Sequence, residues 1–165
     1  MSIEHYLEGK RLIHEHPSIM TDKETPVSLE IIHSIEKKLD KHFPPLYKKF
    51  LIEFGSIGLK GTEIEGINVI GSSVYATGID WTLEDQANGY LPDYLLIIQN
   101  LGIDGEVTCI DFRTQNDQAE NPIVRYVPGA PENTQNYEKA AEDFGEFFLQ
   151  EVMYALESLE EDDDF

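Results

Sequence analysis

Cysteine, histidine and paired carboxylates are the residues of this 165-residue chain that could do chemistry. The one cysteine, Cys109, lies in an apolar segment that is predicted to form a strand, so we expect a packed thiol rather than a nucleophile. The densest group of potential metal ligands is His14-Glu15-His16, but residues two apart on a helix point to different faces. We therefore expect no catalytic thiol, no metal site and no cofactor.

Motifs that bind phosphate or expose a serine nucleophile do not occur in the sequence. It contains no G-x-x-x-x-G-K-[ST], G-x-G-x-x-G or G-x-S-x-G pattern. Carboxylate pairs such as Glu84-Asp85 are numerous, but none has a companion residue that signals acid–base catalysis. Asp111, at the end of an apolar strand, is expected to cap nearby backbone, and the alternative is that it faces a partner. We expect no enzyme; a carboxylate-based enzyme stays an alternative and needs acids that converge in a pocket with raised pKa values.

The charge of the chain is strongly acidic and unevenly placed. Twelve Lys and Arg against 32 Asp and Glu give a net charge of −20. Residues 1–50 hold eight basic and eight acidic residues, so residues 51–165 carry the whole excess. Such a chain repels nucleic acid and anionic membranes. The acidity either serves solubility alone or complements a basic protein partner.

Trp81, the only tryptophan, stands among acids in the segment Asp80-Trp81-Thr82-Leu83-Glu84-Asp85. An exposed tryptophan ringed by carboxylates suits the anchor of a protein interface. The alternative is a partly buried tryptophan that covers the edge of a sheet.

Helical spacing, capping residues and apolar runs predict the elements that position these residues. Ser28 is a suitable N-cap, Pro45 a suitable first helical residue, and Gly55 a suitable residue just beyond a helix. Helices are predicted over 3–15, from 28 to about 41, over 45–54, from Thr82 to near Gly89, and over about 138–159; strands are predicted around 64, and over 67–70, 94–99, 106–112 and 122–127.

Because the helices and strands are segregated, the order predicts an α+β fold. We expect N-terminal helices, a central mixed or antiparallel sheet of about five or six strands, and a long C-terminal helix packed on that sheet. The length fits one domain over residues 1–165, with an additional helix and loop at 1–26 and an acidic tail at 160–165. The N-terminus has no secretory pattern and no apolar run could span a bilayer, so we expect a cytoplasmic protein.

The order of several short motifs resembles the SUKH superfamily, the Smi/Knr-type domain. The match lies in Phe43-Pro44-Pro45-Leu46-Tyr47, Phe54-Gly55-Ser56-Ile57-Gly58, Leu91-Pro92-Asp93-Tyr94-Leu95, Thr108-Cys109-Ile110-Asp111, Pro122-Ile123-Val124, and Phe144-Gly145-Glu146-Phe147-Phe148-Leu149. It covers about residues 28–157. Phe43 stands where the family usually has leucine, and Ile57 where a second glycine is common.

The resemblance implies a binding protein without catalytic residues. It favours the toxin-immunity branch, whose members neutralise a cognate toxin, often a nuclease; the alternative is a regulatory or scaffold module of the cell-wall-regulator type. We expect a basic toxin as partner, and neither nucleic acid nor membrane. Our candidates for partner binding are the aromatic and acidic residues of loops and strand ends: Asp80, Trp81, Glu84, Asp85, Tyr90, Asp93, Asp104 and Glu106.

Overall fold

Five α-helices, two 3₁₀ helices and eight strands make up the described part of the chain. A computed structural model describes residues 2–22, 24–102 and 105–163. In chain order the elements are α1 (Ser2–Glu15), η1 (Pro17–Ile19), α2 (Leu29–Leu39), α3 (Pro45–Glu53), β1 (Ile57–Leu59), β2 (Thr62–Ile64), β3 (Asn68–Ile70), β4 (Ser73–Tyr75), α4 (Thr77–Ala87), β5 (Leu95–Asn100), β6 (Val107–Asp111), β7 (Ile123–Tyr126), η2 (Glu132–Thr134), β8 (Lys139–Ala141) and α5 (Phe144–Asp163).

The predicted α+β class is confirmed, but the predicted central sheet of five or six strands is smaller. Strands β5 to β8 form a four-stranded sheet in sequence order, and every pair in it is antiparallel. The pairs β1–β2 and β3–β4 are separate hairpins. Gly61 and Gly71 turn these hairpins with φ of +82° and +62°, a backbone conformation that glycine adopts without strain. The short strands after Gly55 therefore pair locally instead of widening the sheet.

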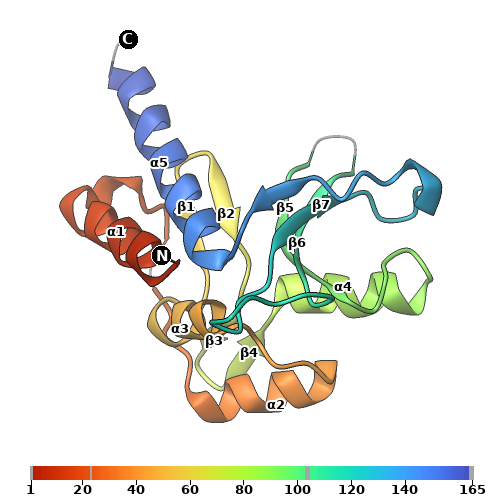
Figure 1. Ribbon diagram of the computed structural model, residues 1–165. Helices are drawn as coiled ribbons and strands as arrows, with labels where there is room; N and C mark the ends of the chain where they lie inside the picture. The colour runs from red at the N-terminus through yellow and green to blue at the C-terminus, as the bar shows by residue number, and fades with distance from the viewer. Residues whose placement is uncertain (1, 23, 103–104, 164–165) are drawn as a thin grey trace.

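Both faces of the four-stranded sheet are buried. Leu96, Ile98, Ile110 and Ile123 face the main core, which also holds the aromatic side chains of α3 and α5. Leu95, Ile97, Cys109 and Val124 face a second, smaller core on the opposite side, next to Trp81. Figure 1 shows α4 below the sheet and α1, α3 and α5 on the other side of the molecule. The alternation follows from the period of two along a strand.

Local helix signals in the first half of the chain act as predicted. Ile31 donates its backbone N–H to the Ser28 hydroxyl at 3.3 Å, which caps α2. Pro45 is the first residue of α3, and Gly55 follows that helix with φ of +76°.

Two predicted helix starts are wrong. Helix α4 begins at Thr77, five residues before Thr82, and Thr82 lies in its interior. The Thr82 hydroxyl accepts the backbone N–H of Ile97 at 2.9 Å and donates to the carbonyl of Gly78 at 2.7 Å. The last helix begins at Phe144 instead of about Glu138, because Lys139–Ala141 pairs with β7 as strand β8.

The acidic residues after Leu159 continue helix α5 as far as Asp163. The expected separate tail at 160–165 is thus helical over its described part. Helix α1 packs along α5, with Tyr6 and Ile13 in the main core. No helix among the described residues is long and apolar enough to cross a membrane.

Candidate functional site

Helix α4 carries four of the predicted partner-binding residues. Asp80 and Glu84 are exposed, whereas Trp81 and Asp85 are half-buried. Burial and the neighbouring charge of Glu84 raise the pKa of the Asp85 carboxyl, because both disfavour its ionised form. Trp81 and Asp85 are four residues apart and share one side of the helix.

The other predicted residues are spread over the molecule. Tyr90 is exposed and lies against Gly129, and Asp93 is exposed near Lys41 at the end of α2. Glu106 is half-buried and forms an ion pair with Arg125 at 3.9 Å. Asp104 lies outside the described residues. The predicted set therefore does not form a single site.

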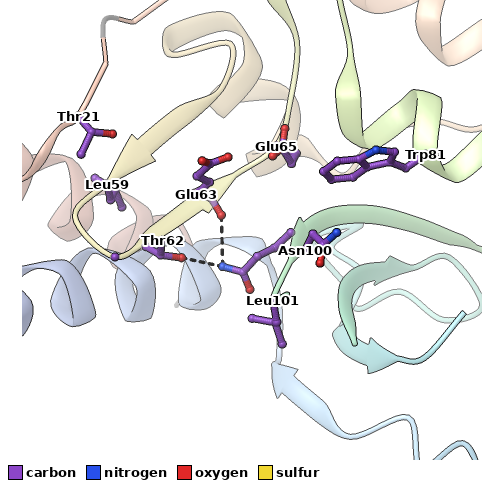
Figure 2. A pocket seen from close by; sticks show the side chains of 10 residues that line it. Thr21, Leu59, Thr62, Glu63, Glu65, Trp81, Asn100 and Leu101 are labelled. Atoms are coloured by element: carbon purple, nitrogen blue, oxygen red, sulfur yellow. Dashed lines mark hydrogen bonds between the residues drawn. The ribbon is translucent and has the colours of Figure 1, made fainter. Parts of the chain in front are cut away.

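Trp81 is partly buried, as one of the two interpretations of the sequence expects, and its role as an interface anchor stays a prediction. Its ring packs against the second core, so it does cover buried strands of the sheet. The same side chain also lines an open hollow between the β1–β2 hairpin and the end of β5. Figure 2 shows the indole extending from α4 toward strand β2.

This hollow, which we call the acidic hollow, has a volume of about 550 Å³. Glu63 and Glu65 line it from β2 and the residue that follows the strand, and Asn100 and Leu101 line it from the end of β5 (Figure 2). Its remaining lining residues are Thr21, Leu59, Gly61, Thr62, Trp81 and Gln99. Two carboxylates beside an indole can bind a cationic group by charge and by contact with the ring face.

The acids of the hollow repel one another. Burial is the main cause that raises the pKa of Glu65 to about 7, and a hydrogen bond with Glu63 and the charges of Glu63 and Asp22 contribute to this rise. None of the ion pairs formed by the described residues places a lysine or arginine on either glutamate. The hollow thus holds negative charge that no described cation neutralises.

A chain of hydrogen bonds fixes the wall between β2 and β5. Buried Gln99 donates its amide to the Thr62 hydroxyl at 2.9 Å and to the Glu63 carbonyl at 3.2 Å, as the dashed lines of Figure 2 show. The Thr108 hydroxyl donates to the Gln99 amide oxygen at 2.9 Å. The Thr62 hydroxyl donates to Glu151 of α5 at 2.6 Å. The side chains of Gln99, Thr62 and Thr108 all have hydrogen-bond partners within this network. The network therefore holds the β1–β2 hairpin rigidly against the sheet.

Glycine lets α4 approach the same wall closely. A Cβ on Gly78 would lie 2.6 Å from the Ile97 carbonyl oxygen and 3.0 Å from Cβ of Glu65. Only a residue without a side chain fits there, so Gly78 brings Trp81 to the edge of the hollow.

A second hollow of about 570 Å³ adjoins the first and shares Gly61, Thr62, Gln99 and Leu101 with it. It continues past Glu106, Arg125, Val127, Glu151 and Tyr154. The predicted residues Trp81 and Glu106 thus line neighbouring parts of one surface.

Reasoning from the sequence missed Glu63 and Glu65. They are two apart in the segment Thr62-Glu63-Ile64-Glu65, on either side of the buried Ile64. That alternation predicts two carboxylates on one exposed side of a strand. This alternation is visible in the sequence, but it does not show which part of the molecule faces the two carboxylates.

Asp111 has the structural role that its position predicts. Its carboxylate accepts the backbone N–H of Arg113 at 3.0 Å and pairs with the Arg113 guanidinium at 2.8 Å. That guanidinium lies over the neighbouring rings of Tyr94 and Tyr137, 4.4 Å from each centroid. The arrangement holds the 127–138 segment against the sheet.

Comparison with known protein families agrees with this architecture. The chain matches the family model SUKH_5, described as SMI1-KNR4 cell-wall, over residues 3–153. The match includes α1, which the motifs of the sequence did not cover, and it ends within α5. Because it spans most of the chain, the protein belongs to the SUKH family of SMI1-KNR4-like domains.

Proposed function

We propose that this protein is an immunity protein that binds and neutralises a basic toxin domain, with the acidic hollow and the neighbouring face of α4 as its contact surface. The observation that carries the proposal is the pair of carboxylates at Glu63 and Glu65, on which no described lysine or arginine lies. Burial, followed by the interactions with Glu63 and Asp22, raises the pKa of Glu65 to about 7. A lysine or arginine placed in the hollow would relieve this repulsion and gain a contact with Trp81.

The distribution of charge supports this proposal. The net charge of −20 comes from residues 51–165, which include α4 and every lining residue of the hollow except Thr21. Opposite charges speed the encounter of two proteins, with rate constants up to about 10⁸–10⁹ M⁻¹s⁻¹ at low salt. Fast capture matters when a toxin has to be stopped before it acts, and a nuclease is a suitable target because its active site has to attract phosphate.

Co-expression with the product of the neighbouring gene tests the proposal. We expect the chain to restore growth in cells that produce that protein, and the two proteins to purify together. The variant Glu63→Gln/Glu65→Gln should associate more slowly and with a weaker dependence on salt. Growth rescue that does not change in this variant would exclude the hollow as the contact.

A matched control separates the site from the total charge. The variant Glu30→Gln/Glu138→Gln removes two carboxylates from exposed positions outside the hollow, one on α2 and one just before β8. Association should change little with this control. A third variant, with Asp80, Glu84 and Asp85 replaced by Ala, tests the α4 face; unchanged association at low salt would remove that face from the proposal.

A regulatory or scaffold module is the second candidate function, and the cell-wall description of the family model favours it. Gene context distinguishes the two. A neighbouring gene for a large protein that ends in a basic domain favours immunity, whereas cell-wall genes without a toxin favour regulation.

The acidic hollow also gives a specific reason to test carboxylate catalysis. Glu63 and Glu65 interact in a concave surface, and the pKa of Glu65 is raised, which is the arrangement that carboxylate catalysis needs. The isolated protein should then turn over a small substrate, and Glu65→Gln should abolish the turnover. Under the immunity proposal, we expect the isolated chain to show no turnover.

A further inference from the structure

An apolar groove runs between α1 and α5, away from both hollows. Leu12 of α1 and Leu149, Met153 and Leu156 of α5 line it, and its volume is about 340 Å³. Met153 exposes half of its surface. Its acidic lining residues are Glu8, Glu157 and Glu160.

The close packing of the two helices shapes this groove. A Cβ on Gly9 would lie 2.7 Å from the Phe148 ring, so glycine allows α1 to lie directly on α5. Figure 1 shows the two helices side by side, with the C-terminal end of α5 extending beyond α1. Leu149, Met153 and Leu156 follow at i, i+4 and i+7, which is the spacing of a stripe that packs against another helix.

On the α5 side, the rim of the groove carries acidic residues that form no ion pair with a described lysine or arginine. Helix α5 contains seven acidic residues and no lysine or arginine. Glu157 and Glu160 take part in none of the ion pairs of the described residues, while Glu8 pairs with Arg11. Acids near the C-terminal end of a helix also oppose its dipole, and a cation beside them would relieve both effects.

We propose that this groove binds an amphipathic, basic α-helix of a partner protein. Its apolar stripe would lie on Leu149, Met153 and Leu156, and lysine or arginine residues beside the stripe would lie near Glu157 and Glu160. A second copy of this chain is a poor occupant, because it would bring the same acids against one another. The groove lies on a different side of α5 from Glu151 and Tyr154, which line the second hollow, so it does not depend on the proposed function.

A synthetic helical peptide of leucine and lysine, about 18 residues long, tests the proposal. Its leucines repeat at helical spacing, and a scrambled peptide of equal composition serves as reference. Fluorescence anisotropy at about 0.15 M salt measures binding to the full chain. We expect the amphipathic peptide to bind at least about tenfold more tightly than the scrambled one.

Two protein variants separate groove binding from general attraction to an acidic protein. Met153→Glu adds a negative charge to the groove, and Tyr154→Glu adds the same charge at an equally exposed position on another side of α5. Groove binding predicts that Met153→Glu weakens the peptide complex about tenfold, while Tyr154→Glu leaves it within about twofold. Equal effects of the two variants, equal binding of both peptides, or a dimer of this chain that Met153→Glu dissociates would each overturn the proposal.

Discussion

Glu120 is a buried carboxyl whose ionisation should destabilise the fold. It exposes 2% of its surface, and its Oε2 accepts the backbone N–H of Leu46 at 3.0 Å, near the start of α3. Its Oε1 has no hydrogen-bond partner among the described residues. The pKa of Glu120 is raised to about 7: burial raises it most, the hydrogen bond from the Leu46 N–H lowers it, and the charge of Asp143 raises it.

Because the pKa is higher in the folded state, the stability linked to Glu120 is complete below its ordinary pKa of 4.5. It is lost as the pH rises through about 7. At about 1.4 kcal/mol for each pH unit, the difference between 4.5 and about 7 corresponds to about 3 kcal/mol. Glu120→Gln stays neutral, so at pH 8 we expect it to be more stable than the parent by up to about this amount. At pH 4.5 the two proteins should differ by less than about 1 kcal/mol.

Urea unfolding of the two proteins at pH 4.5, 6, 7 and 8 measures the free energy of unfolding. Subtracting the free energy of unfolding of the parent from that of the variant at each pH cancels the contributions of the other titrating groups. Asp143→Asn should lower the pKa of Glu120 and so reduce the pH dependence, while the amide still caps α5 at the Glu146 N–H, which lies 2.9 Å from the present cap oxygen. Exposed Glu142→Gln is the matched control and should leave the pH profile unchanged. A Glu120→Gln effect of equal size at pH 4.5 and pH 8 would refute the argument.

Three further predictions concern the contacts that support the hollows and the sheet. Gln99→Leu removes the acceptor of the buried Thr108 hydroxyl and the donor to Thr62 and Glu63, and should lower the free energy of unfolding by about 1–3 kcal/mol in urea titrations. Gly78→Ala forces α4 away from the Ile97 carbonyl, and a thermal melt should show a loss of several degrees together with a shifted Trp81 fluorescence maximum. Arg113→Lys keeps the charge but loses the planar guanidinium that contacts both tyrosine rings, so hydrogen exchange over residues 127–138 should quicken.

Helices with strong local signals could be predicted from the sequence, whereas those decided by distant contacts could not. Ser28, Pro45 and Gly55 mark ends of α2 and α3 through their own backbone preferences. The start of α4 has no such mark, because Ala76 precedes it without a side-chain cap. Thr82 has the pattern of a cap, but its hydroxyl instead bonds β5, fifteen residues away in the sequence.

The sequence contains a local signal for the start of the last helix at Asp143. The prediction followed the apolar periodicity instead and began the helix near Glu138. Asp143 caps α5 by accepting the Glu146 N–H, and an acid three residues before a glutamate is typical of a helix start. The residues before it form β8 because β7 offers an unpaired edge, which a single segment cannot reveal.

Sequence reasoning proposed Trp81 for a partner surface but did not find the hollow that Trp81 lines. The hollow needs the β1–β2 hairpin to lie against β5, and Gln99 makes that contact across 37 residues of sequence. Glu63 and Glu65 therefore gain their importance from a long-range contact rather than from their spacing alone.

The position of Cys109 gives this protein an internal reporter of opening. The thiol is fully buried in the second core, and burial raises its pKa, so it is both inaccessible and protonated in the closed molecule. A disulfide reagent can modify it only while β5, β6 and β7 separate from α4 and its covering tyrosines. Since the chain has no other cysteine, the labelling rate measures how often this part of the molecule opens locally. A partner bound to α4 would lower that rate.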